Sequence, residues 1–274
     1  MGDFNGDGKA DILWRNMNPA AADAGYLYVW LMNGSTVIGS GYTNSQANLG
    51  WQVQGVGDLN GDGKADIVWR KAGPGPDTGA MFLWLMNGAN IIGATYLQPI
   101  SSDWVIQKVA DFNGDGKADI LWRNMNPAAA DAGYLYVWLM NGPTVIGSGY
   151  TNSQANFGWQ VQKVGDLDGD GKADIVWRKV GPGPDTGAMF LWLMNGATIV
   201  GATYLDPIST DWQIQGVADF NGDGRGDILW RNMNPGAADA YYLYIWIMNG
   251  PMVVGGTGYT NSQANNAWQI MNPR

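Results

Sequence analysis

The residues best suited to chemistry in this sequence are aspartates, most of which lie in five short loops of one pattern. The first loop reads Asp3-Phe-Asn5-Gly-Asp7-Gly-Lys9-Ala-Asp11. Alternate spacing on a tightly curled loop points oxygen-bearing side chains inward, and the glycine at position six permits the sharp turn. Carboxylate, amide and main-chain carbonyl oxygens bind hard cations, and such a loop suits Ca²⁺ better than Mg²⁺, which retains water.

The sequence therefore predicts about five bound Ca²⁺ per chain. In each loop the ligands are the side chains at positions one, three, five and nine and the main-chain carbonyl of position seven. The predicted ligands are Asp3, Asn5, Asp7, Lys9 and Asp11; Asp58, Asn60, Asp62, Lys64 and Asp66; Asp111, Asn113, Asp115, Lys117 and Asp119; Asp166, Asp168, Asp170, Lys172 and Asp174; Asp219, Asn221, Asp223, Arg225 and Asp227. An EF-hand is excluded because its twelfth loop position needs Glu, and these loops have Trp there.

Composition excludes most other chemistry. The chain has no Cys and no His, and all 24 acidic residues are Asp, so thiolate and imidazole sites are absent and the usual general bases are missing. Aspartates also recur outside the loops, at Asp23, Asp77, Asp131, Asp185 and Asp239. They occupy the same place in each repeat, in connections where Asp caps turns, so we expect a protein that is not an enzyme. A catalytic pair of carboxylates is the alternative.

The formal charge of −9 gives no basic footprint for nucleic acid. Because five Ca²⁺ would add ten positive charges and bring −9 to +1, the acidity is explained by metal loops. Apolar runs are too short for a transmembrane helix, so no membrane insertion is expected. The N-terminus shows no basic and apolar leader, so a secretion signal would lie outside this sequence.

The whole chain is built from repeats. The loops begin at residues 3, 58, 111, 166 and 219, so their spacings alternate between 55 and 53. Two repeat types alternate in the order A, B, A, B, A. Type A carries the sequence RNMNPxAADA and type B carries RKxGPGPDTG. Within one repeat, β-branched and aromatic runs bounded by turn residues predict four strands, at Trp51–Gly57, Asp66–Arg70, Met81–Asn87 and Asn90–Tyr96. Each Asn-Gly pair predicts a tight hairpin between the third and fourth strands.

Four-stranded sheets with two apolar faces must stack on one another, and radial stacking gives a propeller. We therefore predict an all-β, five-bladed β-propeller with four antiparallel strands per blade, as a single domain over residues 1–274. The chain begins at a metal loop, without a first strand, and Trp268–Met271 repeats that missing strand. We expect residues 268–271 to complete the first blade and close the ring. An open β-solenoid, which needs no such closure, is the alternative.

The stretch Trp51–Arg70, WQVQGVGDLNGDGKADIVWR, resembles an FG-GAP (VCBS-type) repeat, a family that includes integrin α-subunit propellers and a fungal lectin propeller. The resemblance extends over the whole chain. It implies a propeller with calcium in the hairpin between the first and second strands of each blade. Members commonly have seven blades, whereas this chain has material for five.

Two functions remain open: a multivalent carbohydrate-binding lectin, and a protein-binding adhesion or scaffold module without sugar specificity. The long connections at the end of the blade away from the metal loops carry sugar-matching side chains, Asn18, Asp23, Tyr42, Asn44, Gln46 and Asn48. Binding residues concentrate in such loops. We expect a monomer at the cell surface or outside the cell, with glycans as partners. An arginine follows one Trp in each repeat, and stacking or pairing explains it better than ligand binding.

Overall fold

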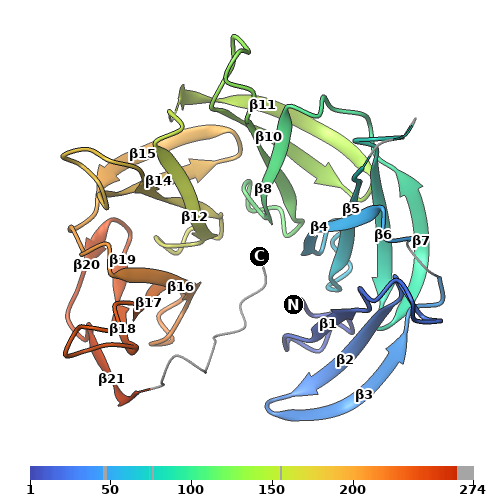
Figure 1. The fold of residues 1–274 in the computed structure, drawn as a ribbon, viewed down its shortest axis with the longest axis horizontal. Helices are drawn as coiled ribbons and strands as arrows, with labels where there is room; N and C mark the ends of the chain where they lie inside the picture. The colour runs from blue at the N-terminus through green and yellow to red at the C-terminus, as the bar shows by residue number, and fades with distance from the viewer. Residues whose placement is uncertain (46–47, 74, 76, 155, 264–274) are drawn as a thin grey trace.

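The computed structural model describes residues 1–45, 48–73, 75, 77–154 and 156–263. The chain forms a five-bladed β-propeller (Figure 1). Blade 1 contains β1 (Ile12–Arg15), β2 (Leu27–Asn33) and β3 (Thr36–Tyr42). Blade 2 contains β4 (Trp51–Gly57), β5 (Asp66–Lys71), β6 (Met81–Asn87) and β7 (Asn90–Tyr96). Blade 3 contains β8 (Trp104–Ala110), β9 (Asp119–Asn124), β10 (Tyr134–Asn141) and β11 (Thr144–Gln154).

Blade 4 contains β12 (Trp159–Gly165), β13 (Asp174–Lys179), β14 (Met189–Asn195) and β15 (Thr198–Tyr204). Blade 5 contains β16 (Trp212–Ala218), β17 (Asp227–Asn232), β18 (Tyr242–Trp246) and β21 (Gly258–Gln263), with the short ribbon of β19 (Met248–Asn249) and β20 (Met252–Val253). Neighbouring strands in every blade pair antiparallel. The four strands predicted for one repeat are confirmed, with β5 one residue longer than expected.

The apolar residues form cores between the blades rather than inside any one of them. Each of four hydrophobic clusters joins one pair of successive blades, from blades 1 and 2 to blades 4 and 5. In blades 2 to 5 one Trp of the second strand lies in these cores, and Trp69, Trp122, Trp177 and Trp230 are at most 1% exposed. Both faces of a blade are therefore apolar because each face is covered by a neighbour.

The first strands of blades 2 to 5 line the centre of the propeller, where the blades come closest (Figure 1). A Cβ on Gly55 of β4 would lie 2.3 Å from the side chain of Val109 on β8. Only glycine allows this approach without displacing the neighbouring strand.

Two blades differ from the regular pattern. Within the described residues blade 1 has three strands, not four, and the predicted closing strand, residues 268–271, lies outside the described residues. Trp14 of β1 is 46% exposed, in contrast to its buried counterparts in the other blades. Blade 5 has one residue more than blade 3 between its Asn-Gly turn and the tyrosine of its outer strand, and this residue accompanies the separation of β19 and β20 from the main sheet.

The described part of the chain contains no helix long and apolar enough to cross a membrane.

Candidate metal loops and an aromatic pocket

The predicted metal loops precede the second strand of each blade, and their own hydrogen bonds hold them tightly curled. In the first loop the carboxylate of Asp3 accepts hydrogen bonds from the N–H groups of Gly6 and Gly8, at 2.7 and 2.6 Å. The amide oxygen of Asn5 accepts from the N–H of Asp7 at 3.1 Å. Both glycines have positive φ, 78° and 81°, a conformation that suits glycine. The carboxylate bonds recur in the other four loops.

The last aspartate of each loop is buried in all five blades. In the second loop the carboxylate of Asp66 accepts from the N–H groups of Leu59 and Met86, at 3.1 and 3.0 Å. Burial raises the pKa of Asp66 to about 7, although these hydrogen bonds act to lower it. Burial likewise raises the pKa of Asp119 and of Asp174 to about 7. Within the described residues no Lys or Arg forms an ion pair with these carboxylates.

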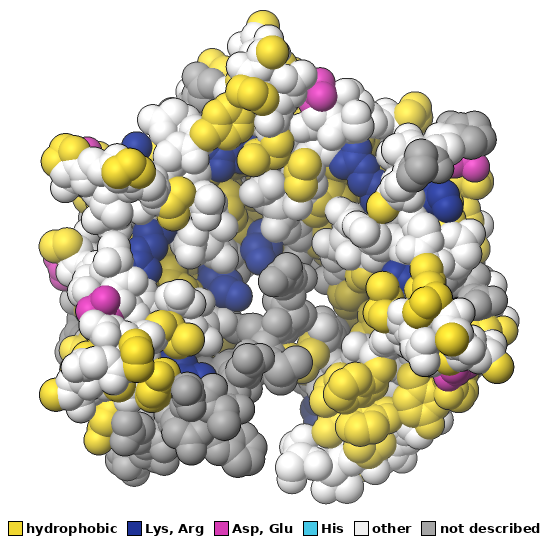
Figure 2. Space-filling model, viewed as in Figure 1, with side chains coloured by type: hydrophobic (Ala, Val, Ile, Leu, Met, Phe, Trp, Pro, Cys, Tyr) yellow, Lys and Arg dark blue, Asp and Glu magenta, His cyan; other side chains and the backbone are white. Residues whose placement is uncertain are grey.

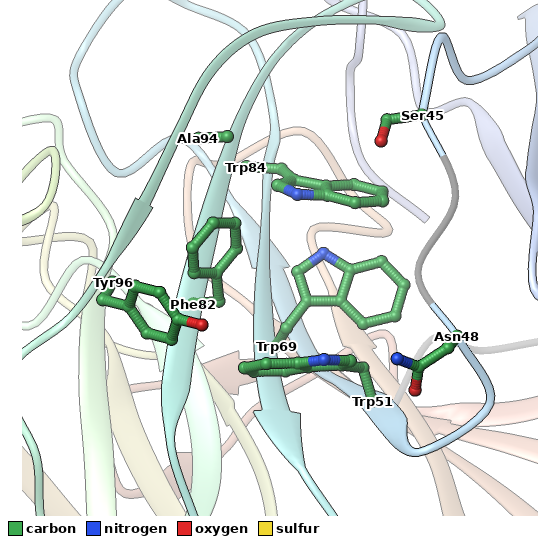
Figure 3. Close-up of a pocket in the computed structure, with 8 residues that line it drawn as sticks. All are labelled: Ser45, Asn48, Trp51, Trp69, Phe82, Trp84, Ala94 and Tyr96. Atoms are coloured by element: carbon green, nitrogen blue, oxygen red, sulfur yellow. The ribbon is translucent and has the colours of Figure 1, made fainter. Parts of the chain in front are cut away.

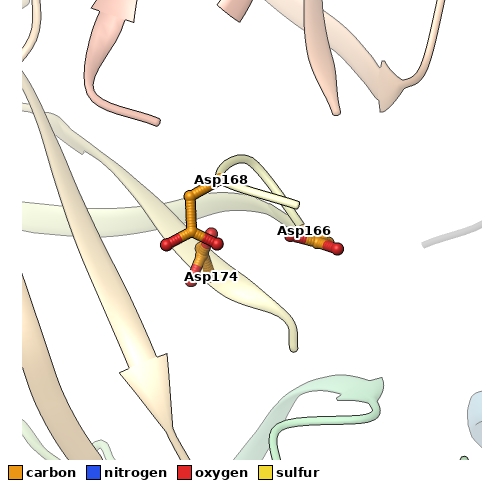
Figure 4. Close-up of side chains that lie close together, drawn as sticks. All are labelled: Asp166, Asp168 and Asp174. Carbon is orange, nitrogen blue, oxygen red and sulfur yellow. The ribbon is translucent and has the colours of Figure 1, made fainter. Parts of the chain in front are cut away.

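The fourth loop brings three carboxylates together (Figure 4). Oxygen atoms of Asp166, Asp168 and Asp174 lie within 4.8 Å of one another. The position-five carboxylate, Asp170, instead contacts Nζ of Lys172 at 2.7 Å. Positions one, three and nine of this loop therefore already converge, whereas position five pairs with the lysine of position seven.

These loops fit a hard divalent cation. The side-chain donors are carboxylates and amides, and a carboxylate that accepts one or two N–H bonds keeps lone pairs for a metal. Positive charge beside the buried position-nine carboxylate would also favour its ionised form. The side chains of position seven turn to position five in other loops too, with Lys9 Nζ 3.2 Å from Asp7 and Arg225 Nη1 3.8 Å from Asp223. A main-chain carbonyl contributed by position seven stays a prediction.

An aromatic pocket lies where blade 1 meets blade 2, at the end of the blade away from the metal loops (Figure 3). It has a volume of about 310 Å³. Trp51, Phe82 and Tyr96 form its wall, with ring centroids 4.7 to 6.3 Å apart. Ser45 and Asn48 reach it from the connection between the blades. The remaining lining residues are Trp69, Trp84 and Ala94.

The same aromatic arrangement occurs where blade 3 meets blade 4. Trp159, Phe190 and Tyr204 have ring centroids 4.6 to 6.3 Å apart. Both junctions lead from a type A blade into a type B blade. In the type A blade 3, Tyr136 and Ser148 replace the Phe and Ala, and their hydroxyl oxygens lie 2.9 Å apart. The A-to-B junctions are therefore the apolar form of this surface, and they number two in the chain.

An arginine from the preceding blade holds the pocket in place. Nη1 of Arg15 donates to the carbonyl of Trp51 at 2.6 Å, and Nη2 donates to the carbonyl of Asn48 at 3.0 Å. The guanidinium lies over the ring of Trp69, 5.0 Å from its centroid. Arg70, Arg123 and Arg178 lie over the next blade's Trp in the same way. The structural interpretation of this arginine is confirmed at these four junctions.

Of the six residues predicted to bind a ligand, the structure brings two together and places one in the pocket. The hydroxyl of Tyr42 donates to Asp23 at 3.0 Å, and Asn48 lines the pocket. Asn44 instead clamps blade 2, exchanging hydrogen bonds with the N–H and carbonyl of Ile91 at 2.9 and 3.2 Å. The amide of Asn18 caps a turn by accepting from the N–H of Ala20. Gln46 lies outside the described residues.

The aromatic wall of the pocket is not among the predicted site residues, because Trp residues in strands are typical of a hydrophobic core. The signal that could have found it is the difference between the repeats: type B has Phe82 and Ala94 where type A has Tyr28 and Ser40.

The fold and loops together define a β-propeller whose blades each carry an acidic loop suited to a hard cation. The FG-GAP-like repeat family matches four overlapping segments, residues 3–69, 58–122, 111–177 and 166–230. The chain belongs to this family.

No curated protein matches the sequence. Among solved structures, the chain is similar to a post-proline cleaving enzyme from Rickettsia typhi, at 10% identity and a TM-score of 0.48, covering 94% of this chain and 36% of that one. It is also similar to a candidate dipeptidyl aminopeptidase IV from Bacteroides ovatus, at 9% identity and a TM-score of 0.32, covering 87% of this chain and 47% of that one. The chain thus spans less than half the length of either, and similarity at this level carries no conclusion about activity.

Proposed function

We propose that this chain is a calcium-loaded extracellular binding module, a lectin that binds carbohydrate at its A-to-B junctions. It performs no catalysis in this account, and calcium serves to hold the blades together. Glycans or glycoconjugates at the cell surface are its partners, and the chain is a monomer.

The acidic loops support the metal part of the proposal. Five loops of one geometry place carboxylate and amide oxygens around a tight turn, and each has a buried carboxylate at its end. Oxygen ligands from several side chains and a main-chain carbonyl favour Ca²⁺ over Mg²⁺, which retains water. A cation there would neutralise charges that otherwise oppose one another within each loop.

The aromatic pocket is the observation that carries the carbohydrate part. Sugars present apolar C–H faces and a rim of hydroxyl groups, and this pocket pairs aromatic rings with neutral polar groups. Its volume of about 310 Å³ lies at the small end of ligand sites, which suits one sugar ring. Tyr96 is 62% exposed, so its ring is available for stacking. Asn48 offers an amide, whose oxygen already accepts from the N–H of Gly50 at 3.0 Å.

The second candidate function is a protein-binding scaffold. Exposed apolar side chains at the same position of four outer strands favour it, with Ile38, Ile92, Ile146 and Val200 each more than half exposed. Figure 2 shows hydrophobic side chains at the rim of the propeller, outside an inner ring of Lys and Arg. Exposed apolar side chains repeated from blade to blade suit a protein partner better than a sugar.

A glycan array followed by titration with the best-bound sugar separates the two functions. We expect Tyr96→Ala with Tyr204→Ala to weaken sugar binding by about tenfold or more, since each loses a stacking face worth on the order of 1–2 kcal/mol. The control is Ile92→Ala with Val200→Ala, which changes equally exposed residues on the same strands, outside the described lining. This control should bind sugar as the parent does.

If the array is blank, or if the control loses as much affinity as the tyrosine variant, the carbohydrate proposal fails and the scaffold function becomes the better account.

A further inference from the structure

Successive metal loops are joined to one another by a direct main-chain hydrogen bond. The N–H of Ala65, at position eight of the second loop, donates to the carbonyl of Asp3, at position one of the first loop, with an N···O distance of 2.6 Å. The same bond recurs at the next three junctions, from Ala118 to Asp58 at 2.6 Å, from Ala173 to Asp111 at 2.7 Å and from Gly226 to Asp166 at 2.5 Å.

The donor N–H belongs to the peptide group whose carbonyl is a predicted metal ligand. The peptide between positions seven and eight carries the carbonyl of Lys64 on one side and the N–H of Ala65 on the other. Because a trans peptide is planar, the two groups point in opposite directions, and fixing one fixes the other. The carbonyl of Asp3 in one loop thus sets the direction of a ligand carbonyl in the next loop.

Two further contacts strengthen the connection between the first two loops. The aliphatic part of Lys64 packs over Gly6, where an added Cβ would lie 3.4 Å from its Cγ. The Gly88 N–H, in the Asn-Gly turn of blade 2, donates to the carbonyl of Phe4 at 2.6 Å. Equivalent turn bonds reach Leu59, Phe112 and Leu167 in the following loops. Each of the first four loops is therefore fixed from the side by the blade that follows it.

We propose that, in the first four loops, the main-chain carbonyl of the position-one aspartate is a positioning group for the metal in the next loop, so that neighbouring loops load calcium cooperatively, in series. This rests on the proposed calcium binding. A cation bound to the carbonyl oxygen of position seven would polarise that peptide and strengthen its N–H as a hydrogen-bond donor. The stronger bond orders position one of the preceding loop, whose side chain is itself a ligand. By linkage, metal in either loop raises the affinity of the other by the same factor.

The connections form a chain with two ends. Between the described residues, bonds of this type link loops one to two, two to three, three to four and four to five, and none links Ala10 to Asp219. The third loop therefore has a linked neighbour on each side, and the first loop has one.

Calcium titration of the metal-free full-length chain, followed by native mass spectrometry and calorimetry, tests the proposal. The pair Asp111→Asn with Asp115→Asn weakens the third loop, and Asp3→Asn with Asp7→Asn makes the matched change in the first loop. The third-loop variant should lower the mean affinity of the remaining sites by about fivefold or more, within the usual range of coupling between sites. The first-loop variant should lower it less.

A second pair of variants addresses the hydrogen bond itself. Ala118→Pro removes the linking N–H and keeps the ligand carbonyl of Lys117, whereas Ala118→Gly keeps both and matches the glycine found naturally at Gly226. We expect the proline variant to load its ions with less cooperativity and the glycine variant to load like the parent. Circular dichroism identifies a proline variant that does not fold. In that case the paired-aspartate variants alone test whether neighbouring loops bind calcium cooperatively.

Calcium binding to the parent chain without cooperativity, or equal losses of calcium affinity in the first- and third-loop variants, would overturn the coupling while leaving calcium binding intact. A parent chain that binds no calcium would overturn the proposed metal function instead.

Discussion

At the scale of single residues, the aspartate of position nine has two tasks that the sequence pattern does not separate. Asp119 accepts hydrogen bonds from Phe112 and Met140, at 2.9 Å each, and so ties the metal loop to the third strand of its blade. The spacing of the motif predicts a ligand at this position. It could not predict the structural task, because the donor from the third strand is 21 residues away along the chain.

The glycine at position six of each loop gives a residue-scale prediction. Gly116 has a φ of 80°, and an added Cβ there meets no atom within 4 Å. Gly116→Ala should therefore cost only the conformational strain of a side chain in the left-handed region, about 1–2 kcal/mol of unfolding free energy. Urea unfolding of the metal-free protein measures it.

The control for that prediction is Gly255→Ala, which also has open space for a Cβ but no positive φ. It should change stability by less than about 0.5 kcal/mol. Equal effects of the two substitutions would contradict the conformational explanation.

At the scale of elements, the blade is predictable from sequence and the junction between blades is not. Strands of seven residues such as β4, β6 and β7 follow directly from β-branched and aromatic runs bounded by turn residues such as Asn-Gly. The pocket depends on Ser45 and Asn48 from one connection meeting Trp51 and Phe82 across a junction. No local sequence pattern predicts which residues meet at the junction between two blades. The pocket could therefore not be predicted without the arrangement of the blades.

The arginine at each junction gives the element-scale prediction. Nη1 and Nη2 of Arg123 donate to the carbonyls of Trp159 and Asn156, at 2.6 and 3.0 Å, and the side chain is 2% exposed. Arg123→Met would leave two carbonyls without these donors, so we expect a loss of about 2–4 kcal/mol in unfolding free energy.

Lys9→Met serves as the control, since Lys9 makes an exposed ion pair with Asp7 that should contribute little to stability. Chemical denaturation of both variants in calcium gives the comparison. An Arg123 variant as stable as the Lys9 variant would show that the blades are held together without this contact.

At the scale of the whole molecule, four interblade cores join the five blades in series, and the closure of the ring remains a prediction. Trp14 is 46% exposed and Phe220 is likewise 46% exposed, whereas Trp69 and Phe112 in the regular blades are buried. Trp69, the counterpart of Trp14, packs in a core against the preceding blade, and Phe112, the counterpart of Phe220, packs in a core against the following blade. The sequence predicts that residues 268–271 supply the first strand of blade 1, as Trp159–Gly165 does in blade 4.

Removing residues 268–274 tests this closure. The truncated chain would leave the edge of β1 unpaired, and unpaired edges promote association. We expect oligomers or aggregates in size-exclusion chromatography with light scattering, together with a large fall in melting temperature. A soluble truncated monomer that melts like the full chain would show that the ring is closed by other residues.

Calorimetric titration of the metal-free protein, with melting curves in calcium and in chelator, tests whether the acidic loops bind Ca²⁺ and whether bound Ca²⁺ stabilises the propeller. We expect about five ions per chain and a melting temperature lower by many degrees in chelator, since a ligand at 100 times its dissociation constant adds about 2.7 kcal/mol per site. Fewer than about three sites, or a melting temperature indifferent to chelator, would contradict this expectation.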